Sequence, residues 1–274
     1  MASHDIFQAL NDQPAAVVDT VIERMEFRGR DPGFNAMLEA YLAKLDLTQA
    51  SDVLDLGCGT GVAARAIARM PGFPGRVSGV DPSGPLIEAA RRLAAEAGLA
   101  ERLRFEVGDG HGLAYPDASF DAAVAHTAIS HVSEPLTVLC ELRRVLRPRG
   151  VLAIFDGDYA SLVLSHPDAA FEGRVMEAVR RGMVANPTVL RQLPRLLRGC
   201  GFEIVECLPF VLADVGRGSF FPNFAETFGP IVANHGLVPR ADAERWLADQ
   251  RRAAAEGTFF GSCNYYAYVA RRTE

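Results

Sequence analysis

The chain has 274 residues, of which 49% are hydrophobic and 23% charged, which is the composition of a globular protein that buries one large core. No stretch approaches the roughly 18–20 uninterrupted apolar residues of a membrane span, so no membrane partner is expected. The formal net charge of −6 argues against nucleic acid as a partner, because a basic patch would have to attract it against an acidic background.

The first residues and the cysteines bear on the compartment. The sequence of residues 1–6 lacks the basic and apolar regions of a signal peptide, which predicts a cytoplasmic location. The five cysteines are scattered and odd in number, and none of them forms a CxxC pair or a Cys/His spacing typical of zinc. We therefore expect reduced thiols, no disulfide framework and no metal site.

The first predicted elements are two helices. Residues 15–28 carry apolar side chains at helical spacing, and a second helix is predicted to begin at Asp31-Pro32, a capping residue followed by proline at the first helical position. Both helices precede the first predicted strand. We therefore expect residues 1–50 to form an N-terminal helical cap over a sheet or over a site on it.

From residue 51 to 156, short apolar strands alternate with helices. Strands are predicted at 52–56, 76–81, 103–107, 121–125 and 151–156. Helices are predicted at about 61–70, 85–97 and 134–147. Ser83 and Ser133 are candidate caps for the second and third of these helices. This alternation is typical of a parallel, doubly wound α/β sheet.

The alternation loosens after residue 156. Helices are predicted at about 168–185 and 188–198, and strands at 202–212 and 264–270. The segment 213–257 between the two strands is too long for a hairpin and places Phe221, Phe224 and Phe228 at near-helical spacing. Two interpretations stay open: a helix packed on the core, or a lid that lines an apolar substrate pocket.

The most informative segment is the turn that follows the first strand. It contains Gly57, Gly59 and Gly61, with Cys58 between the first two, and a helix follows directly. Glycines there allow a sharp turn and let a ligand lie against the backbone, while the helix N-terminus offers free N–H groups. The spacing G-x-G-x-G differs from the dinucleotide fingerprint G-x-G-x-x-G.

Asp55 lies two residues before the first glycine. A carboxylate so close to the turn repels a pyrophosphate and suits a ligand with an ammonium group, such as the amino acid end of S-adenosyl-L-methionine. At this point residues 51–156 resemble the class I S-adenosylmethionine-dependent methyltransferases, most closely the branch with the ubiquinone and menaquinone methyltransferases.

The resemblance assigns further cofactor-binding residues in register. Asp81 at the end of the second strand, followed by Pro82 and Ser83, corresponds to the acid that accepts hydrogen bonds from the ribose hydroxyls. Asp109 and Gly110 follow the third strand, where the acid commonly meets the adenine amino group. Each acid taken singly has the alternative of an ordinary loop acid, but three acids at successive strand ends favour the joint assignment.

The resemblance also implies the overall architecture. The expected fold is α/β, a Rossmann-like doubly wound sheet of seven strands whose last strand, 264–270, is antiparallel, with helical cap elements. The expected domains are the N-terminal cap at 1–50 and a methyltransferase domain at 51–274, with a helical insertion at about 213–257. A homodimer is kept as the alternative to a monomer.

Candidates for the acceptor side follow the fourth and fifth strands. His126 and His131 are the candidate catalytic residues, because a histidine can remove the acceptor's proton. His126 has the alternative of a cofactor contact. Asp156 and Asp158 orient an acceptor or cap a turn. Arg28 reaches the cofactor's carboxylate if the first two helices fold over the site, and is an exposed arginine otherwise.

The function that these residues indicate is transfer of a methyl group from S-adenosylmethionine to an O, N or C atom of a small, apolar or aromatic molecule. Two alternatives stay open. A protein of the same fold can bind S-adenosylmethionine without transferring methyl, as a sensor or a rearrangement catalyst. A NAD-dependent oxidoreductase is disfavoured by the glycine spacing.

Overall fold

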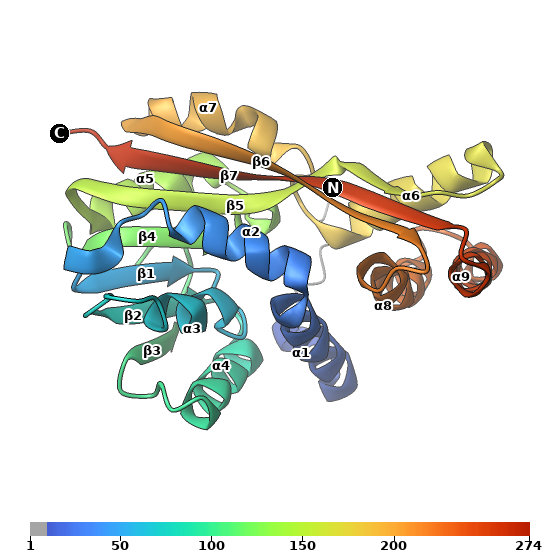
Figure 1. The fold of residues 1–274 in the computed structure, drawn as a ribbon, viewed down its shortest axis with the longest axis horizontal. Coiled ribbons are helices and arrows are strands. Elements are labelled where there is room, and N and C mark those ends of the chain that lie inside the picture. The colour runs from blue at the N-terminus through green and yellow to red at the C-terminus, as the bar shows by residue number, and fades with distance from the viewer. Residues whose placement is uncertain (1–9) are drawn as a thin grey trace.

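The computed structural model describes residues 10–274, so the first nine residues of the expected N-terminal cap lie outside the described residues. The described chain forms a sheet of seven strands in the order β3-β2-β1-β4-β5-β7-β6 (Figure 1). The strands are β1 (Asp52–Leu56), β2 (Arg76–Asp81), β3 (Leu103–Val107), β4 (Phe120–His126), β5 (Leu146–Leu164), β6 (Phe202–Gly216) and β7 (Phe259–Arg272).

Strand directions follow the doubly wound pattern. The pairs β2–β3, β1–β2, β1–β4 and β4–β5 are parallel, and β7 runs antiparallel to both β5 and β6. The order reverses between β1 and β4, and ligands of such sheets bind at the carboxyl ends beside this switch point. The prediction of a seven-stranded Rossmann-like sheet with an antiparallel last strand is confirmed.

Helices cover both faces of the sheet. They are α1 (Ala15–Arg30), α2 (Pro32–Leu42), α3 (Val62–Ala68), α4 (Gly84–Glu96), α5 (Pro135–Val145), α6 (Ala169–Met183), α7 (Val189–Gly199), α8 (Phe220–Asn234) and α9 (Arg240–Glu256), with 3-10 turns at Leu10–Asp12, Leu47–Gln49 and Ile129–His131. One core holds buried residues of α2, α3 and α4 against the sheet, and a second holds those of α5 and α7 on the opposite face. Helix α1 lies next to the carboxyl ends of β1 and β2 (Figure 1).

Local capping explains where several helices begin. The Asp31 side chain accepts a hydrogen bond from the Phe34 amide at the start of α2, and the Ser83 side chain accepts one from the Leu86 amide at the start of α4, as predicted. The prediction for Ser133 is wrong. Helix α5 begins at Pro135 directly after Glu134, and the Ser133 hydroxyl instead contacts Nε2 of His111 at 3.3 Å.

The last three strands are much longer than the sequence pattern predicted. Strand β5 continues beyond Asp156, the last residue of the predicted strand, through Asp158, and pairs with β7 as far as Leu164. The strands can continue because β7 hydrogen-bonds to both β5 and β6 beyond the parallel part of the sheet. Helices α6, α8 and α9 pack on this extension, which projects to the right in Figure 1.

The segment 213–257 divides into the end of β6 and the helices α8 and α9. The side chains of Phe221, Phe224 and Phe228 are at most 5% exposed and belong to the core of the extension, together with Trp246 of α9. The structure therefore supports the interpretation of this stripe as a packed helix face.

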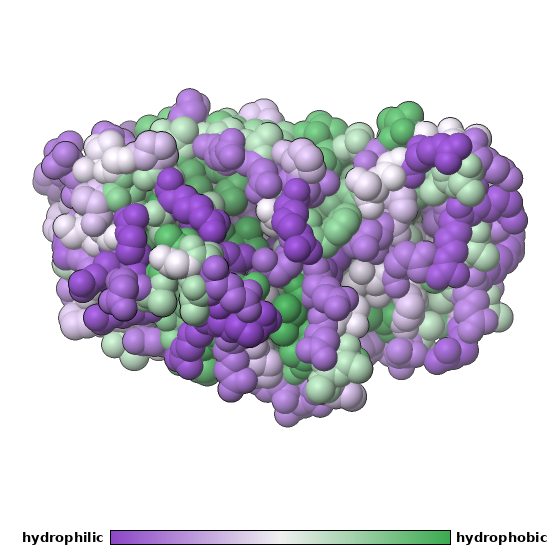
Figure 2. Space-filling model, turned by 60° about the horizontal axis from the view of Figure 1, so that its bottom comes forward, coloured by the Kyte–Doolittle hydropathy of each residue, from purple (hydrophilic) through white to green (hydrophobic). Residues whose placement is uncertain are grey.

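One face of the molecule is mostly hydrophilic. Figure 2 shows a face on which hydrophilic side chains dominate and hydrophobic ones are visible between them, mainly toward the centre. Within residues 10–274, no helix combines the length and apolar character that crossing a membrane requires.

Candidate functional site

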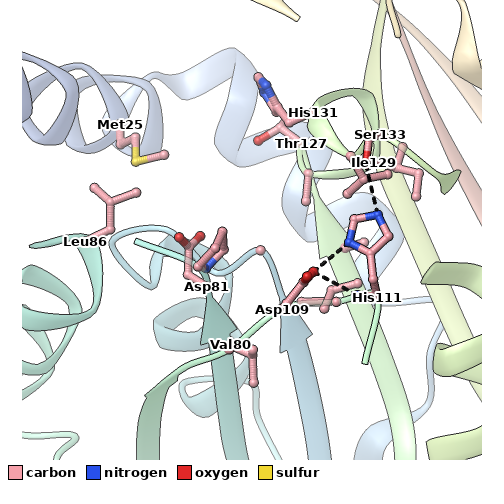
Figure 3. A pocket seen from close by; sticks show the side chains of 18 of the residues that line it. Met25, Val80, Asp81, Leu86, Asp109, His111, Thr127, Ile129, His131 and Ser133 are labelled. Carbon is pink, nitrogen blue, oxygen red and sulfur yellow. Dashed lines mark hydrogen bonds and ion pairs between the residues drawn. The ribbon is translucent and has the colours of Figure 1, made fainter. Parts of the chain in front are cut away.

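Two neighbouring cavities lie at the carboxyl ends of β1, β2 and β4, next to helix α1. The larger has a volume of about 310 Å³ and the smaller about 30 Å³. Figure 3 shows the larger cavity, with Met25 and Leu86 on one side, Asp81 at its centre, and Asp109 and His111 on the other side. Met25, Arg28, Gly57 and Thr127 line both cavities, so the two are adjacent and share a wall.

The glycine turn forms the boundary between the cavities. Gly57 and Gly59 have φ angles of +64° and +51°, a backbone conformation that favours glycine. A Cβ atom on Gly57 would lie 2.5 Å from Cβ of Ala128, and one on Gly59 would lie 2.9 Å from Cε of Met25. The turn therefore needs glycine for both its conformation and its close packing under α1.

Asp55 lies inside β1, one residue from its end, and its side chain is fully buried. One oxygen, Oδ2, accepts a hydrogen bond from the Ala64 amide at 3.0 Å, whereas Oδ1 has no partner although it is buried. Burial raises the pKa of Asp55 to about 7. A buried carboxylate oxygen without a donor, beside a cavity that Asp55 lines, is chemically suited to a cationic ligand.

Asp81 ends β2 and organises the turn around it. Its Oδ2 accepts a hydrogen bond from the Gly59 amide and its Oδ1 accepts one from the Ser83 amide, both at 2.9 Å. Burial raises the pKa of this carboxyl, and the two amide hydrogen bonds oppose that shift. A carboxylate has about four acceptor positions, so Asp81 can still accept hydrogen bonds from a ligand in the cavity that it lines.

Asp109 lies in the loop after β3, and its side chain is largely exposed. Its Oδ1 accepts the His111 amide at 2.9 Å and contacts Nδ1 of the same residue at 2.6 Å. The amide hydrogen bond lowers the pKa of Asp109, so the carboxylate is ionised at neutral pH. This pair forms one wall of the larger cavity (Figure 3).

The two candidate histidines lie in different cavities. His126 ends β4 and lines the smaller cavity, where its Nδ1 lies 2.9 Å from the Tyr41 hydroxyl and its ring stacks on Phe155. Burial, together with the nearby Arg28 charge, lowers the pKa of His126 to about 3. His131 lines the larger cavity, on the side of Thr127 (Figure 3).

Helix α1 is tied to the site by polar contacts. Arg28 donates from Nη2 to the Thr127 hydroxyl at 2.7 Å and lines both cavities. Two residues earlier, Glu26 accepts a hydrogen bond from the Thr60 hydroxyl at 2.6 Å and two from Arg65 at 2.8 Å. The first helices therefore fold over the glycine turn, which is the condition under which Arg28 reaches the cofactor.

The structure brings most of the predicted residues together. The larger cavity is lined by Arg28, Gly57, Asp81, Pro82, Asp109, Gly110 and His131. The smaller cavity is lined by Arg28, Asp55, Gly57, Cys58, Gly59 and His126. Gly61 and Ser83 line neither, because Gly61 precedes α3 and packs against the Phe105 ring, and Ser83 caps α4. Both shape the turns instead.

Several residues at the site carried no signal in the sequence. Thr127 follows β4 with a φ of +53°, a strained conformation for threonine, and holds Arg28. Met25, Glu26 and Tyr41 come from the first two helices and meet the sheet only through tertiary packing. A threonine after a strand, or a glutamate on an amphipathic helix, is too common a pattern to predict a site.

Comparisons with known proteins agree with this geometry. Residues 54–154 match the protein family described as "Methyltransferase domain". The chain is 38% identical over 170 residues to the methyltransferase GfsG of Streptomyces halstedii, covering 62% of this chain and 59% of that protein. It is 32% identical over 241 residues to a 37.1 kDa uncharacterized protein in transposon TN4556 of Streptomyces fradiae, covering 87% of this chain and 66% of that protein.

A solved structure with the same fold is the [4+2]-cyclase SpnF, with a TM-score of 0.58 and 26% identity over 89% of this chain and 85% of that one. The fold and the glycine turn define a Rossmann-like class I methyltransferase domain. Residues 54–154 of this chain therefore form a domain similar to the methyltransferase domain family, and GfsG is a relative named as a methyltransferase. It spans less than two thirds of the length of each of the two relatives named above.

Proposed function

We propose that this protein transfers the methyl group of S-adenosylmethionine to an O, N or C atom of a small, apolar or aromatic molecule. The observation that carries the proposal is the buried Oδ1 of Asp55, which has no hydrogen-bond donor and belongs to a residue that lines the smaller cavity. An ammonium group in that cavity satisfies this oxygen, and the amino acid end of the cofactor supplies one.

The two cavities divide the cofactor between them. The larger is suited to the adenosine moiety, with Asp81 accepting hydrogen bonds from the ribose hydroxyls and Asp109 and Gly110 beside the adenine. The smaller is suited to the methionine end, with Asp55 opposite the ammonium group and Arg28 opposite the carboxylate. Cys58 and Gly59 also line this cavity.

When bound, S-adenosylmethionine supplies an electrophilic methyl group that an acceptor atom attacks in line. The residues of this chain then contribute mainly alignment and exclusion of water. Helix α1 covers the glycine turn through the contacts of Glu26 and Arg28, so the reacting groups are screened from solvent. No metal-ligating group of three or more His, Cys, Asp or Glu side chains occurs in the part of the chain that the structure describes.

Of the two histidines, we assign removal of the acceptor's proton to His126. It lies beside the smaller cavity, where the methionine end is placed, whereas His131 lies with Asp81 in the cavity assigned to adenosine. A pKa of about 3 keeps the ring neutral and able to accept a proton, although it makes His126 a weak base. His131 is then a cofactor contact.

A second candidate function is a rearrangement catalysed without methyl transfer. The solved structure named as a [4+2]-cyclase has this fold at 26% identity, and its name indicates chemistry other than methylation. The cofactor residues of the two classes look identical in sequence. The two functions are separated by incubating the protein with labelled S-adenosylmethionine and measuring whether S-adenosylhomocysteine forms in step with product.

The first prediction concerns cofactor choice. We expect calorimetry to measure micromolar binding of S-adenosylmethionine or S-adenosylhomocysteine, about −8 kcal/mol, and no comparable heat with NAD. The reason is the acid at the glycine turn, which favours an ammonium group and repels a pyrophosphate. Preferential binding of NAD would contradict the proposed function.

The second prediction concerns Asp81. Replacement by alanine is expected to weaken cofactor binding by about 1–3 kcal/mol, because the ribose hydroxyls lose a charged acceptor. The same change frees the buried amides of Gly59 and Ser83, so thermal unfolding has to be measured alongside calorimetry. Asp81→Asn keeps an acceptor oxygen for one amide and is the control for folding. An unchanged affinity in both variants would disprove the ribose role.

The remaining partner predictions follow from the sequence alone. A small molecule as the acceptor is part of the proposed function. Exclusion of nucleic acid rests on the net charge of −6. The cap at 1–50 and the insertion at about 213–257 are proposed to cover the acceptor side. The reason is that α1, α2 and α8 lie beside one another around the side chains of Phe34 and Phe220.

A further inference from the structure

Arg24 is a cation in the cap, and the acidic side chains of residues 10–274 form no ion pair with it. It lies one helical turn before Arg28 on the same side of α1. Its Nη1 donates to Oδ1 of Asn223 in α8 at 2.7 Å, and its guanidinium lies 4.3 Å from the centre of the Phe220 ring. Among residues 10–274, no carboxylate oxygen lies within 4.0 Å of this guanidinium.

The surroundings of Arg24 are unusual for an arginine. Burial, followed by the charge of Arg28, lowers its pKa to about 10, so the group is still charged at neutral pH. The groups whose charges favour the cation are Tyr265, then Asp31 and Tyr159. The one carboxylate among them, Asp31, accepts a hydrogen bond from the Phe34 amide as the cap of α2. Arg24 is half-buried, its guanidinium has five N–H donors, and cations withdrawn from water are normally paired with an anion.

Aromatic rings connect Arg24 with the site of methyl transfer. Phe220, under the guanidinium, packs against Phe34 at 4.8 Å between ring centres, and Phe34 packs against Tyr265 at 5.1 Å. Tyr265 stacks on Phe155 at 5.6 Å, and Phe155 stacks on His126 at 4.9 Å. The series leads from the cation to the smaller cavity.

Helix α1 supplies two cations, Arg28 and Arg24, one for the cofactor carboxylate and one for an anionic group of the acceptor. If Arg28 binds the methionine carboxylate, Arg24 is the cation that stays available, one helical turn away. A planar ring system is chemically suited to contact the aromatic side chain beside Arg24, since offset-stacked and edge-to-face contacts are favourable with such surfaces. Arg24 is suited to a carboxylate or phenolate because a guanidinium binds planar anionic oxygens through paired hydrogen bonds.

We propose that Arg24 determines acceptor specificity, and that the acceptor is an aromatic or conjugated molecule that carries an anionic oxygen bound by Arg24. This inference rests on the proposed function, because it places the cofactor at the glycine turn. Helix α8 supplies both Phe220 and Asn223. Arg24 and Asn223 are each half-buried, so an acceptor reaches the guanidinium with α8 in place. The Asn223 amide holds the cation until the acceptor replaces it.

The test uses a matched pair of probes on the protein saturated with S-adenosylhomocysteine. 2-Naphthoate carries a carboxylate, and 2-naphthamide has the same ring and nearly the same shape without the charge. We expect calorimetry to measure at least about tenfold tighter binding of the naphthoate, the factor that one hydrogen-bonded charge contributes. Equal affinities, or no binding of either probe, would overturn the inference.

Two variants locate the preference at Arg24. Arg24→Gln removes the charge, and Asn223→Asp leaves Arg24 in place but gives it a permanent carboxylate partner. Both are expected to reduce the preference for naphthoate to within about twofold, because the cation is lost or neutralised. Arg30→Gln, on an exposed side chain of the same helix, is the control and is expected to keep the full preference.

Binding of S-adenosylhomocysteine distinguishes failure of the proposed function from failure of the role assigned to Arg24. If the unmodified protein does not bind it, the proposed function fails. If S-adenosylhomocysteine binds normally to the variants and the naphthoate preference persists in Asn223→Asp and Arg24→Gln, only the assignment to Arg24 is wrong. Asn223→Asp retains every side chain of α1, so the test stands even if Arg24→Gln does not fold.

Discussion

Replacing Asp55 by asparagine is expected to reduce the affinity for S-adenosylmethionine by about 10²-fold or more, because removing one partner of a buried charge pair costs roughly 3–5 kcal/mol. The ligand-free protein is expected to be no less stable at pH 8. There, the wild-type chain holds a buried carboxylate whose Oδ1 has no donor, and asparagine removes that charge. Calorimetry and denaturant unfolding at the same pH measure the two effects.

Asp121→Asn is the matched control for Asp55→Asn. Asp121 belongs to the adjacent strand β4 but lies at its other end, where it accepts the Ser51 and Asp52 amides and pairs with Arg147. It lines neither cavity. We expect Asp121→Asn to lower stability and leave cofactor affinity within about twofold, the opposite pattern. Loss of stability with unchanged affinity in Asp55→Asn would contradict its assignment.

The raised pKa of Asp55 also gives the direction of a pH effect. Its pKa is about 7 in the folded chain and about 3.9 when unfolded, so between these values the native state holds the extra proton. The stability that this group contributes to the ligand-free protein is therefore present at low pH and lost as the pH rises through 7. An ammonium ligand needs the ionised form. Cofactor affinity should rise between pH 6 and 8, with proton release on binding that disappears in Asp55→Asn.

Replacing His126 by alanine is expected to lower turnover by about 10²-fold with cofactor affinity nearly unchanged. This is the lower end of the range for general acid–base catalysis, because a base with a pKa of about 3 accepts a proton with little driving force. The imidazole is neutral above that pKa, so its protonation does not reduce turnover between pH 5 and 8. Single-turnover transfer of labelled methyl to an accepted acceptor, across that pH range, is the measurement.

His131→Ala is the comparison for the His126 variant. It lines the cavity assigned to adenosine, so we expect its main effect on cofactor affinity rather than on turnover at saturating cofactor. A fall in wild-type turnover with a midpoint near 6.5 would show that a histidine with an ordinary pKa is titrating. Near-normal turnover in both variants would mean that alignment alone supports transfer.

Local sequence was enough to predict the parallel half of the sheet and its cofactor side. Short apolar strands, the caps Asp31 and Ser83, and the glycine turn act over a few residues, and such signals survive any tertiary arrangement. The acids at the ends of the first three strands could be predicted to converge because carboxyl ends of parallel strands meet at one edge. Asp81 and Asp109 do line the larger cavity, and Asp55 lines the adjacent smaller one.

The long strands β5, β6 and β7 were predicted too short because their extensions depend on one another. Asp156-Gly157-Asp158 has the composition of a turn, and its strand conformation comes from pairing with Tyr266, Tyr265 and Asn264 of β7. Pairing over a sequence separation of about a hundred residues carries no local signal, since strand preference depends on the partner strand and on burial. The extension therefore forms only when the three strands β5, β6 and β7 pair with one another in the folded chain.

The sequence by itself determined the fold class, the similarity to methyltransferases and the residues that surround the glycine turn, because each of these is encoded in short-range spacing. Only the tertiary structure decided which side chains come to the site from elsewhere. Packing of α1 on the sheet brings Arg28 to Thr127, packing of α2 brings Tyr41 to His126, and packing of α8 brings Asn223 to Arg24. These contacts join residues 85 to 199 positions apart. Burial in such contacts, and not residue type, also lowers the pKa of His126 and raises that of Asp55.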